Sequence, residues 1–504
     1  ALAGEFNFRY FTQPIIRALA ALGVAVGIVF GAVPGMTATM AIAVFLPLTY
    51  AFDMATALYL LLGLYVGGIS GGLLAAILIN IPGTPSSLCT TFDGYPMAKR
   101  GEAERALKIG IVSSLMGGLF SLGCLWLLTP PLARIAIKFG AVEKFLLILW
   151  AMTVIAALSK GSMVKGIFAG FLGVFISLIG EFSDNNTMRM VPHLFRRELR
   201  AGFQLLPALI GLFAVTQLFQ EAESGMKAAS MDQGADTHST RKFSFRDFKG
   251  NGINVIRSAA IGTLMGILPG VGGSAASIMA YSQAKSFSKH PEDFGTGTPE
   301  GLIASESSNN GLTGGALVPL LSLGIPGDST TAVMIGAFML HGLQVGPLFI
   351  TQNPDIWNTI LLALLISNIL MFLLMFYPLK WVAKIVKIPK KRVFPVVILM
   401  CVVGAYATRS GVMFDVWSML IFGALGYIFA KIKLPVAPFL IGFILGGDLE
   451  TYFMDALNGH DKSLIAFFTR PLGWAIWALI ILSVGYAIWD NRKGKKMESA
   501  GMKD

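Results

Sequence analysis

Charged residues are scarce in this sequence, and long charge-free runs stand in their place. Only 13% of the 504 residues are Asp, Glu, Lys or Arg, against roughly 25% in soluble domains. Several runs, such as Ile109–Ala133 and Ile356–Leu379, are as long as the ~20 residues that cross a bilayer as a helix. The sequence has no ~10-residue alternating segments of the kind found in membrane β-barrels. It therefore predicts an all-α polytopic membrane protein.

Cysteine and histidine are also rare. Cys89, Cys124 and Cys401 are scattered through apolar segments, so we interpret them as small buried residues rather than as disulfides or metal ligands. The five histidines offer no nucleophile–base or metal constellation of the kind that an enzyme needs. No GxxxxGK(S/T) loop is present, which argues against ATP as the energy source. We expect neither an enzyme nor a bound metal or cofactor.

The net charge of +11 is carried largely by short loops beside apolar runs. This pattern follows the positive-inside rule and is not typical of a nucleic-acid-binding protein. The basic segments are Lys99–Lys108, Arg189–Arg200, Lys380–Arg392 and Arg492–Lys496, whereas Asp448–Asp461 is acidic. We predict that Lys380–Arg392 and the C-terminal tail are cytoplasmic and that the acidic segment is extracytoplasmic.

Two charge-free runs, Ala18–Phe52 and Met54–Phe92, are too long for one straight crossing. Each contains a Pro-Gly pair, at 34–35 and at 82–83. Proline removes an amide donor and glycine permits unusual backbone, so each pair predicts a break in the helix. Broken backbone at membrane depth is tolerated where it is buried in protein or lines a polar cavity. We therefore expect discontinuous helices or re-entrant hairpins.

The same pair of breaks returns in the second half of the chain. GIVFGAVPGMTA at 27–38 matches GTLMGILPGVGG at 262–273. GISGGLLAAILINIPGTPSS at 68–87 matches GLTGGALVPLLSLGIPGDSTT at 311–331, with one inserted residue. We interpret the chain as an internal duplication. Its predicted parts are an N-terminal segment (1–14), a first repeat (15–220), a polar connector (221–250), a second repeat (251–490) and a basic tail (491–504).

Loop charge indicates how the two repeats are oriented. After the second break, the first repeat has the basic loop Lys99–Lys108, whereas the second repeat has HGLQVGPLFITQNPD without Lys or Arg. This difference predicts inverted topology, although the basic residues within 241–257 do not fit it. Inverted repeats with paired broken helices are typical of secondary transporters, which hold substrate near the bilayer midplane.

A polar stretch, SESSNNG at 305–311, precedes the second break of the second repeat, and we expect it to line the substrate site. A helix that restarts after Pro-Gly points free amides and a positive dipole end at the cavity, which favours an anion. Nearby hydroxyl and carbonyl oxygens can hold Na⁺. The predicted substrate-binding residues are Pro34, Gly35, Asn80, Gly83, Thr84, Ser86, Ser87, Gly270, Ser307, Ser308, Asn309, Asn310, Gly327, Ser329 and Thr330.

Two acidic residues, Glu306 and Asp328, border the charge-free run next to these breaks. A carboxylate near bilayer depth costs on the order of 2.5–3.5 kcal/mol on insertion scales, so it is normally paired or protonated. We predict that one or both couple transport to Na⁺ or H⁺, with a Na⁺ site near Asn309 and Asp328. The alternatives are that Asp328 only caps a helix and that Glu306 lies at the membrane surface near Lys285.

The motifs PGMTATMA, YVGGISGGLLAAILINIPGTPSS, LPGVGGSAAS and ESSNNGLTGGALVPLLSLGIPGDSTTAVMIGA resemble the TctA family. That family is the large membrane subunit of bacterial tripartite tricarboxylate transporters. The resemblance extends from about residue 15 to 490. It implies about 12 membrane segments in the bacterial inner membrane and uptake of a carboxylate driven by a cation gradient. It also implies two partners, a small membrane subunit and a periplasmic solute-binding protein.

Two other functional classes remain open. A passive organic-anion channel would also use helix ends to attract its ligand, and a gradient-independent flux would identify it. A membrane-embedded enzyme would need a catalytic constellation that the residues do not supply, and product formation in detergent would be required to support it.

Overall fold

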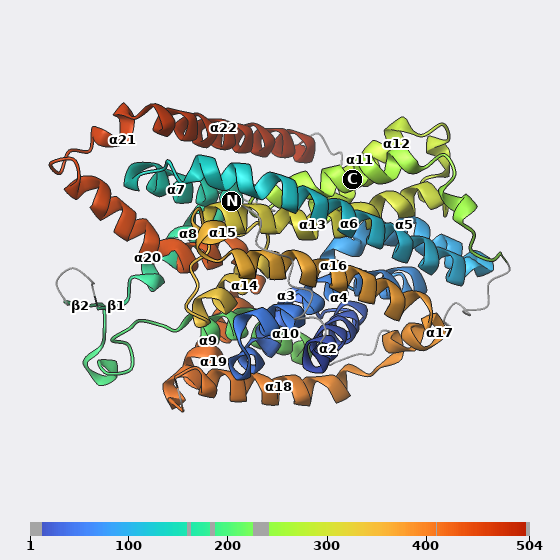
Figure 1. Cartoon of the computed structure of the whole chain (residues 1–504), viewed down its shortest axis with the longest axis horizontal. Coiled ribbons are helices and arrows are strands. Elements are labelled where there is room, and N and C mark those ends of the chain that lie inside the picture. The colour runs from blue at the N-terminus through green and yellow to red at the C-terminus, as the bar shows by residue number, and fades with distance from the viewer. Residues whose placement is uncertain (1–12, 159–162, 182–186, 225–240, 410, 500–504) are drawn as a thin grey trace.

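The computed structural model describes residues 13–158, 163–181, 187–224, 241–409 and 411–499. These residues are mostly helical (Figure 1). The described strands are β1 (Gly180–Glu181) and β2 (Met188–Arg189), which form an antiparallel hairpin. The predicted all-α class is therefore confirmed. Nearly all of the predicted N-terminal segment, residues 225–240 of the connector and residues 500–504 of the tail lie outside the described residues.

Seven helices among the described residues are long and apolar enough to cross a membrane. They are Pro14–Ala32, Met54–Ile79, Pro85–Ala136, Leu205–Glu223, Pro354–Phe376, Met413–Lys431 and Val436–Asn458. The shorter apolar helices are Ala38–Ala51, Met163–Ser177, Gly252–Ile267, Ser329–Leu340 and Pro471–Gly485. This set of helices is that of a multi-pass membrane protein.

The first half of the chain contains two interrupted helices followed by one long helix. The first comprises α2 (Pro14–Ala32), α3 (Ala38–Phe45) and the 3₁₀ segment η1 (Leu46–Ala51). The second comprises α4 (Met54–Ile79), η2 (Pro85–Ser87) and α5 (Leu88–Met97). A π-helical turn, η3 (Ala98–Glu102), then leads into α6 (Ala103–Ala136).

The second half repeats this order. Here the interrupted helices are α11 (Gly252–Ile267) with α12 (Gly272–Phe287), and α13 (Pro299–Leu323) with α14 (Ser329–Leu340). They are followed by α15 (Phe349–Gln352) and α16 (Pro354–Phe376). All four Pro-Gly pairs lie between helices, because proline cannot continue the hydrogen-bond ladder of the helix that precedes it.

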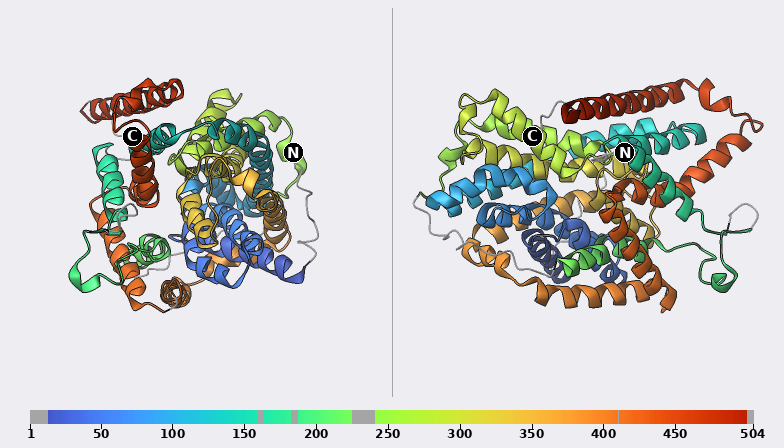
Figure 2. Two further views of the ribbon diagram at one scale, coloured as in Figure 1. Left: turned by 60° about the vertical axis from the view of Figure 1, so that its left-hand side comes forward. Right: turned by 180° about the vertical axis from the view of Figure 1, so that it is seen from behind.

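The remaining elements lie outside this group. They are α7 (Ala141–Leu158), α8 (Met163–Ser177), η4 (His193–Phe195), α9 (Leu205–Leu209), η5 (Ile210–Val215), α10 (Thr216–Glu223), η6 (Phe245–Phe248), η7 (Pro291–Asp293), α17 (Leu379–Val382), η8 (Ala383–Lys387), α18 (Lys390–Ala407), α19 (Met413–Lys431), α20 (Val436–Asn458), α21 (Ala466–Thr469) and α22 (Pro471–Ser499). Figure 2 shows α8, α20 and α22 on one side of the molecule and the interrupted helices on the other. The outer helices α7, α8, α20 and α22 pack on one another.

The interrupted helices pack closely through glycine. In α2, Gly27 leaves no room for a Cβ, which would lie 2.7 Å from the carbonyl oxygen of Leu64 in α4. The matching Gly262 of α11 likewise lies against the carbonyl oxygen of Ser308 in α13. Small residues allow such backbone approach, which is a common basis of helix association in membranes. The sequence match between the two halves therefore corresponds to matching helix contacts.

Candidate functional site

The polar stretch of the second repeat lies inside the protein. Ser305 to Asn310 are each 0% exposed, and they belong to α13, which packs against α4, α6 and α11. With 25 residues, α13 is long enough to cross a bilayer, but its polar residues keep it out of the apolar set above. So much buried polarity is unfavourable unless hydrogen bonds satisfy it.

Four successive residues of α13 carry buried polar atoms without a hydrogen-bond partner among the described residues. These atoms are Ser307 Oγ, Ser308 Oγ, Asn309 Oδ1 and Asn310 Nδ2. A buried unsatisfied polar atom costs roughly 1–3 kcal/mol, and native interiors contain few of them. These four consecutive residues make up about one turn of the helix, so the unsatisfied atoms are concentrated in one short stretch of α13.

The other amide atoms of this stretch connect α13 to α4 of the first repeat. Ser70 Oγ donates to Asn310 Oδ1 at 2.7 Å, and Asn309 Nδ2 donates to the carbonyl oxygen of Ile69 at 3.3 Å. These bonds orient both amides, so the unsatisfied Asn309 Oδ1 and Asn310 Nδ2 are held in fixed positions. Ser70 was not among the predicted site residues, although it lies within the matched GISGG motif.

The first repeat's second break brings hydroxyl groups to the same region. Asn80 ends α4 in a left-handed conformation with φ of 56°. The chain then restarts at a capping box in which Thr84 N donates to Ser87 Oγ at 3.3 Å and the Thr84 and Ser87 hydroxyls lie 2.7 Å apart. Thr84 Oγ1 also lies 3.1 Å from Ser86 Oγ. Three predicted residues thus converge at one helix start.

Helix α12 of the second repeat closes over this helix start. Ser277 Oγ donates to the carbonyl oxygen of Ser86 at 2.7 Å, and Ser274 Oγ donates to that of Pro85 at 2.9 Å. A Cβ built on Gly273 would lie 2.5 Å from Ser86 Cβ and 3.7 Å from Asn309 Oδ1. Ser86 and Asn309 therefore meet at Gly273. We call Thr84, Ser86, Ser87, Ser277 and Asn309 the first-break cluster.

The second repeat's second break forms a related arrangement. Thr331 donates to Asp328 Oδ1 through its backbone N and its hydroxyl, both at 2.7 Å. Tyr65 OH of α4 donates to Asp328 Oδ2 at 2.9 Å, and the hydroxyls of Thr39 and Thr330 lie 2.8 Å apart. We call Tyr65, Thr39, Asp328, Thr330 and Thr331 the second-break cluster. Asp328 thus caps α14 and also contacts the first repeat.

The structure places Glu306 deep in the protein. Its side chain is 0% exposed and accepts hydrogen bonds from Thr90 Oγ1 and Ser114 Oγ, the latter at 2.9 Å. Among the described residues no basic side chain forms an ion pair with it. The Glu306 carboxylate is therefore enclosed by protein rather than exposed on its surface, and no ion pair joins it to Lys285. Thr90 and Ser114 were not predicted from the sequence.

The structure places the predicted site residues in several separate regions of the protein. Asn309 belongs to the first-break cluster and Asp328 to the second, so a single Na⁺ site near both does not follow from these contacts. Gly270 N donates to the carbonyl oxygen of Gly327 at 2.9 Å, which places it beside the second-break cluster. Gly35, next to Pro34, instead faces Gln217 and Glu221 of α10. Ser329 begins α14.

Helix α16 adds two polar residues that the sequence did not single out. Ser367 and Asn368 are each 0% exposed, and Ser367 Oγ and Asn368 Oδ1 have no hydrogen-bond partner in the described chain. The Asn368 amide fills the space beside Gly118 of α6, while the adjacent Gly117 faces Ser307 of α13. Helix α6 therefore connects this polar pair to the stretch in α13.

Within the described residues, no group of three or more His, Cys, Asp or Glu side chains is arranged to hold a metal ion. Any cation bound near the two clusters would therefore rely on hydroxyl, amide and carbonyl oxygens with Glu306 or Asp328.

Comparisons with known proteins give a consistent result. Residues 18–441 match the family described as the tripartite tricarboxylate transporter TctA family. An uncharacterized 52.8 kDa protein in the TAR-I ttuC' 3' region of Agrobacterium vitis is 33% identical over 492 residues, which cover 98% of this chain and 97% of the relative. An uncharacterized protein in the TAR-II ttuC' 3' region is 33% identical over 235 residues, or 47% of this chain and 97% of the relative. No solved structure matches the chain.

Proposed function

The chain belongs to the TctA family of tripartite tricarboxylate transporters, and from this premise we propose that it carries a di- or tricarboxylate across the bacterial inner membrane. The proposed position of the substrate site rests on one observation. It is the row of unpaired polar atoms at Ser307–Asn310, which meets the helix start at Thr84–Ser87 through Ser86 and Asn309. Amides and hydroxyls without a nearby Lys or Arg bind a carboxylate reversibly, as a transporter requires.

We assign substrate binding to the first-break cluster together with Ser307, Ser308 and Asn310. Helix starts at Pro-Gly breaks direct free backbone amides and a positive dipole end at the ligand. A hydroxyl has a single proton, and the Thr84 and Ser86 hydroxyls already share one hydrogen bond, so one of the two can donate to the ligand, and the Asn310 amide nitrogen can donate another bond. A carboxylate oxygen accepts several such bonds, so this donor set suits an organic anion.

The proposed topology is two inverted repeats with about 12 membrane segments. Gly23 faces Leu60 and Gly31 faces Gly68, so α2 and α4 run side by side in one direction. The α3–η1 segment then has to return the chain to the side on which α2 began, which makes α2 and α3 a re-entrant hairpin. The matching contacts of α11 with α13 support a second hairpin.

Contacts between α4 and α13 support opposite orientations for the two repeats. Ser70 bonds to Asn310, whereas a Cβ on Gly110 would lie 3.6 Å from atoms of both Leu73 and Glu306. The two helices therefore run antiparallel. The hairpins that accompany them enter from opposite sides, as in transporters with inverted repeats.

The proposed sidedness rests on where basic loops gather. Lys108 lies over the ring of Phe376, and Arg105 pairs with Asp247. The α5–α6 turn, the end of the connector and the segment after α16 are therefore on one side, which we assign to the cytoplasm. Figure 1 shows α5 and α17 at this end and the β1–β2 hairpin at the other. The basic tail, whose residues 491–499 form the end of α22, would also be cytoplasmic.

We propose that Glu306 is the principal coupling residue. It is a fully buried carboxylate without a basic partner among the described residues, and two hydroxyls orient it. Such a group within a membrane protein binds a proton or a cation. We assign Asp328 a second coupling role, because Tyr65 connects it to the first repeat, so its protonation or cation contacts would be transmitted to both repeats.

The proposed assembly includes two partners. The family name describes a tripartite transporter, so we propose a small membrane subunit and a periplasmic solute-binding protein that delivers the carboxylate. The chain would then act as the membrane-spanning carrier within that assembly.

The test is uptake of labelled citrate and related di- and tricarboxylates into cells that express this chain with its partner subunits. Uptake is measured with Na⁺ present or replaced, and with the proton gradient intact or collapsed. Loss of uptake with one gradient would support a coupled carrier and identify the ion. Flux that ignores both gradients would favour a passive anion channel, and failure to transport any carboxylate would overturn the proposed substrate class.

A further inference from the structure

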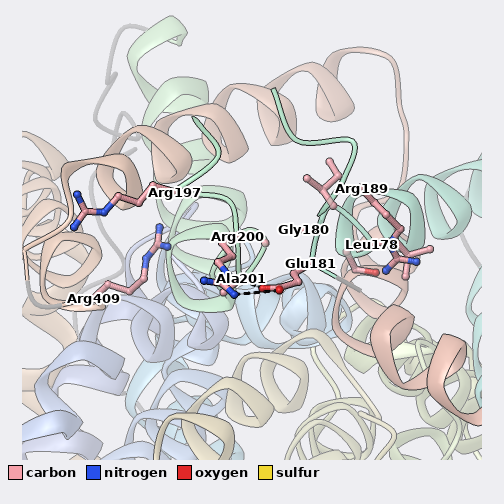
Figure 3. A pocket seen from close by; sticks show the side chains of 11 residues that line it. Leu178, Gly180, Glu181, Arg189, Arg197, Arg200, Ala201 and Arg409 are labelled. Atoms are coloured by element: carbon pink, nitrogen blue, oxygen red, sulfur yellow. Dashed lines mark hydrogen bonds and ion pairs between the residues drawn. The ribbon is translucent and has the colours of Figure 1, made fainter. Parts of the chain in front are cut away.

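A pocket of about 650 Å³ lies apart from the interrupted helices, beside the β1–β2 hairpin (Figure 3). It is lined by Ser177, Leu178, Ile179, Gly180, Glu181, Arg189, Arg197, Arg200, Ala201, Gly202 and Arg409. Four of these residues are arginines, and among the described residues that line the pocket Glu181 supplies the one carboxylate. Figure 3 shows Arg200 and Arg189 on opposite sides of Glu181.

Two glycines allow the chain to form this pocket. Gly180 and Gly202 have φ values of +135° and +69°, which favour glycine. A Cβ on Gly180 would lie 2.9 Å from the backbone N of Gly202, and Glu181 N donates to the carbonyl oxygen of Arg200 at 2.8 Å. The segment after α8 and the segment before α9 are therefore held side by side.

Ion pairs position three of the four arginines. Arg189 pairs with Glu450 of α20 at 2.6 Å, and Arg200 pairs with Glu181 at 2.6 Å. Arg409 donates to Asp415, which is 0% exposed, and to the carbonyl oxygen of Glu198 at 2.6 Å.

Arg197 differs from the other three. It is exposed and forms no ion pair with the residues that the structure describes. Its charge is therefore available to a ligand.

The location of these arginines is unexpected. Their segment, Arg189–Arg200, was grouped with the basic loops in the sequence, but Arg189 pairs with Glu450 of the acidic segment. Helices α8 and α20 pack in parallel, because Gly170 lies against Gly442 and Ser177 against Gly446. The segment that follows α8 is therefore at the same end of the molecule as the C-terminal end of α20. The pocket is thus at the end opposite to the other basic loops, where the positive-inside rule disfavours Arg in short loops. Positive charge retained there indicates a function other than orientation.

We propose that this pocket binds a small polyanion with two or more carboxylate groups on the extracytoplasmic face. The choice of polycarboxylate rests on the proposed function. Guanidinium groups match carboxylates with paired, charge-assisted hydrogen bonds, and groups on different elements suit a ligand with separated carboxylates. Binding displaces the Glu181 carboxylate from Arg200, so Glu181 competes with the ligand for that arginine. The pocket would concentrate substrate near the carrier without being part of its transport site.

The experiment measures equilibrium binding of labelled citrate to the full chain in nanodiscs of neutral lipid at low ionic strength. The wild-type chain is expected to bind two citrates. Arg197→Gln with Arg200→Gln is expected to remove one, whereas Asn309→Ala removes the other. Glu181→Gln is expected to tighten binding at the pocket by about tenfold, since a competing carboxylate is lost. Arg196→Gln, a neighbouring exposed arginine outside the lining, is the matched control and should change neither site.

Three outcomes separate the alternatives. Unchanged stoichiometry in the double arginine variant would overturn the pocket while leaving the transport site intact. If inorganic phosphate, or an anionic phospholipid placed in the nanodiscs, displaces citrate at equal or lower concentration, the pocket is a general phosphate or lipid-headgroup site and the polycarboxylate assignment is overturned. Citrate bound at the pocket in a chain that transports no carboxylate would support the pocket and overturn the proposed function.

Discussion

The two Pro-Gly breaks that precede α5 and α14 have the same backbone features, but their capping side chains differ. Each preceding helix ends in a left-handed residue, Asn80 in one and Gly324 in the other. Each restart has a capping box, formed by Thr84 in the first repeat and by Asp328 in the second. The first break therefore presents hydroxyls and the second a carboxylate. In the proposed function, the first break binds the anion and the second takes part in coupling to a cation or proton.

The largest effect is expected at Gly83 and Gly327, because each of the two breaks depends on an equivalent close contact between backbones. A Cβ on Gly83 would overlap the carbonyl oxygen of Gly31, and one on Gly327 would overlap that of Gly266. Gly83→Ala and Gly327→Ala should each lose folded protein and uptake, because overpacking against backbone costs on the order of 1–3 kcal/mol or more. Thermal unfolding in detergent measures this, with Gly123→Ala, which meets nothing within 4 Å, as the control. A loss in only one variant would show that the breaks are not structurally equivalent.

A nearly complete loss of uptake is expected from Asn309→Ala and Asn310→Ala, with folding and membrane insertion retained. The unsatisfied Asn310 Nδ2 is a proposed donor to the substrate, and the unsatisfied Asn309 Oδ1 can accept a hydrogen bond or bind a cation, so rate and affinity should both fall. Ser322→Ala is the matched control on α13, because among the described residues its hydroxyl bonds only to the carbonyl oxygen of Val318 in its own helix. Wild-type transport by either asparagine variant would place the substrate elsewhere.

The two acidic residues should respond differently to neutral substitution. Glu306→Gln is expected to abolish dependence on the coupling gradient, since it removes the buried charge between Thr90 and Ser114. Asp328→Asn retains an N-cap, because Asn caps helices as well as Asp, so the melting temperature should stay near that of the wild type. Uptake by Asp328→Asn should nevertheless fall by roughly tenfold, as expected for the loss of one charged hydrogen-bonding group.

The outcome of these two variants decides between coupling and structure. Unchanged uptake in Asp328→Asn would reduce that residue to a helix cap, and unchanged gradient dependence in Glu306→Gln would remove Glu306 from the coupling mechanism.

The smallest effects are expected where hydroxyls join the repeats. Ser277→Ala removes the donor to Ser86, and Thr39→Val removes the partner of Thr330. Each should lower the free energy of unfolding by about 0.5–1.5 kcal/mol, the net value of one hydrogen bond. Chemical denaturation measures both. A much larger loss of unfolding free energy in Ser277→Ala than in Thr39→Val would mean that the first-break cluster contributes more to the packing between the repeats.

Local chemistry made the helix breaks predictable. Pro34, Pro82, Pro269 and Pro326 interrupt their helices wherever the chain folds, because the missing amide and the ring act within a few residues. The buried polar stretch at 305–310 was also predictable, since a charged and amide-rich segment between apolar runs is costly unless it is used. These signals need no knowledge of distant contacts.

Partners far apart in the sequence were not predictable. Nothing in the local sequence indicates that Tyr65 meets Asp328, that Ser277 meets Ser86, or that Thr90 and Ser114 hold Glu306. Ser367 and Asn368 of α16 were missed because two polar residues in an apolar helix give no signal without the neighbouring Gly118. The contact of the basic segment at 189–200 with Glu450 was not predictable either, because loop charge alone does not reveal which other segment a loop contacts.

The sequence by itself determined that this is an apolar, helical membrane protein and where the four helix breaks lie, because hydropathy, proline and glycine act locally. Only the tertiary structure decided which residues from distant parts of the chain come into contact. It placed Ser86 beside Asn309 and Tyr65 beside Asp328, and it set Arg189 against Glu450. Those pairings depend on how helices from two repeats pack around each other, and that packing is a property of the whole fold rather than of any one segment.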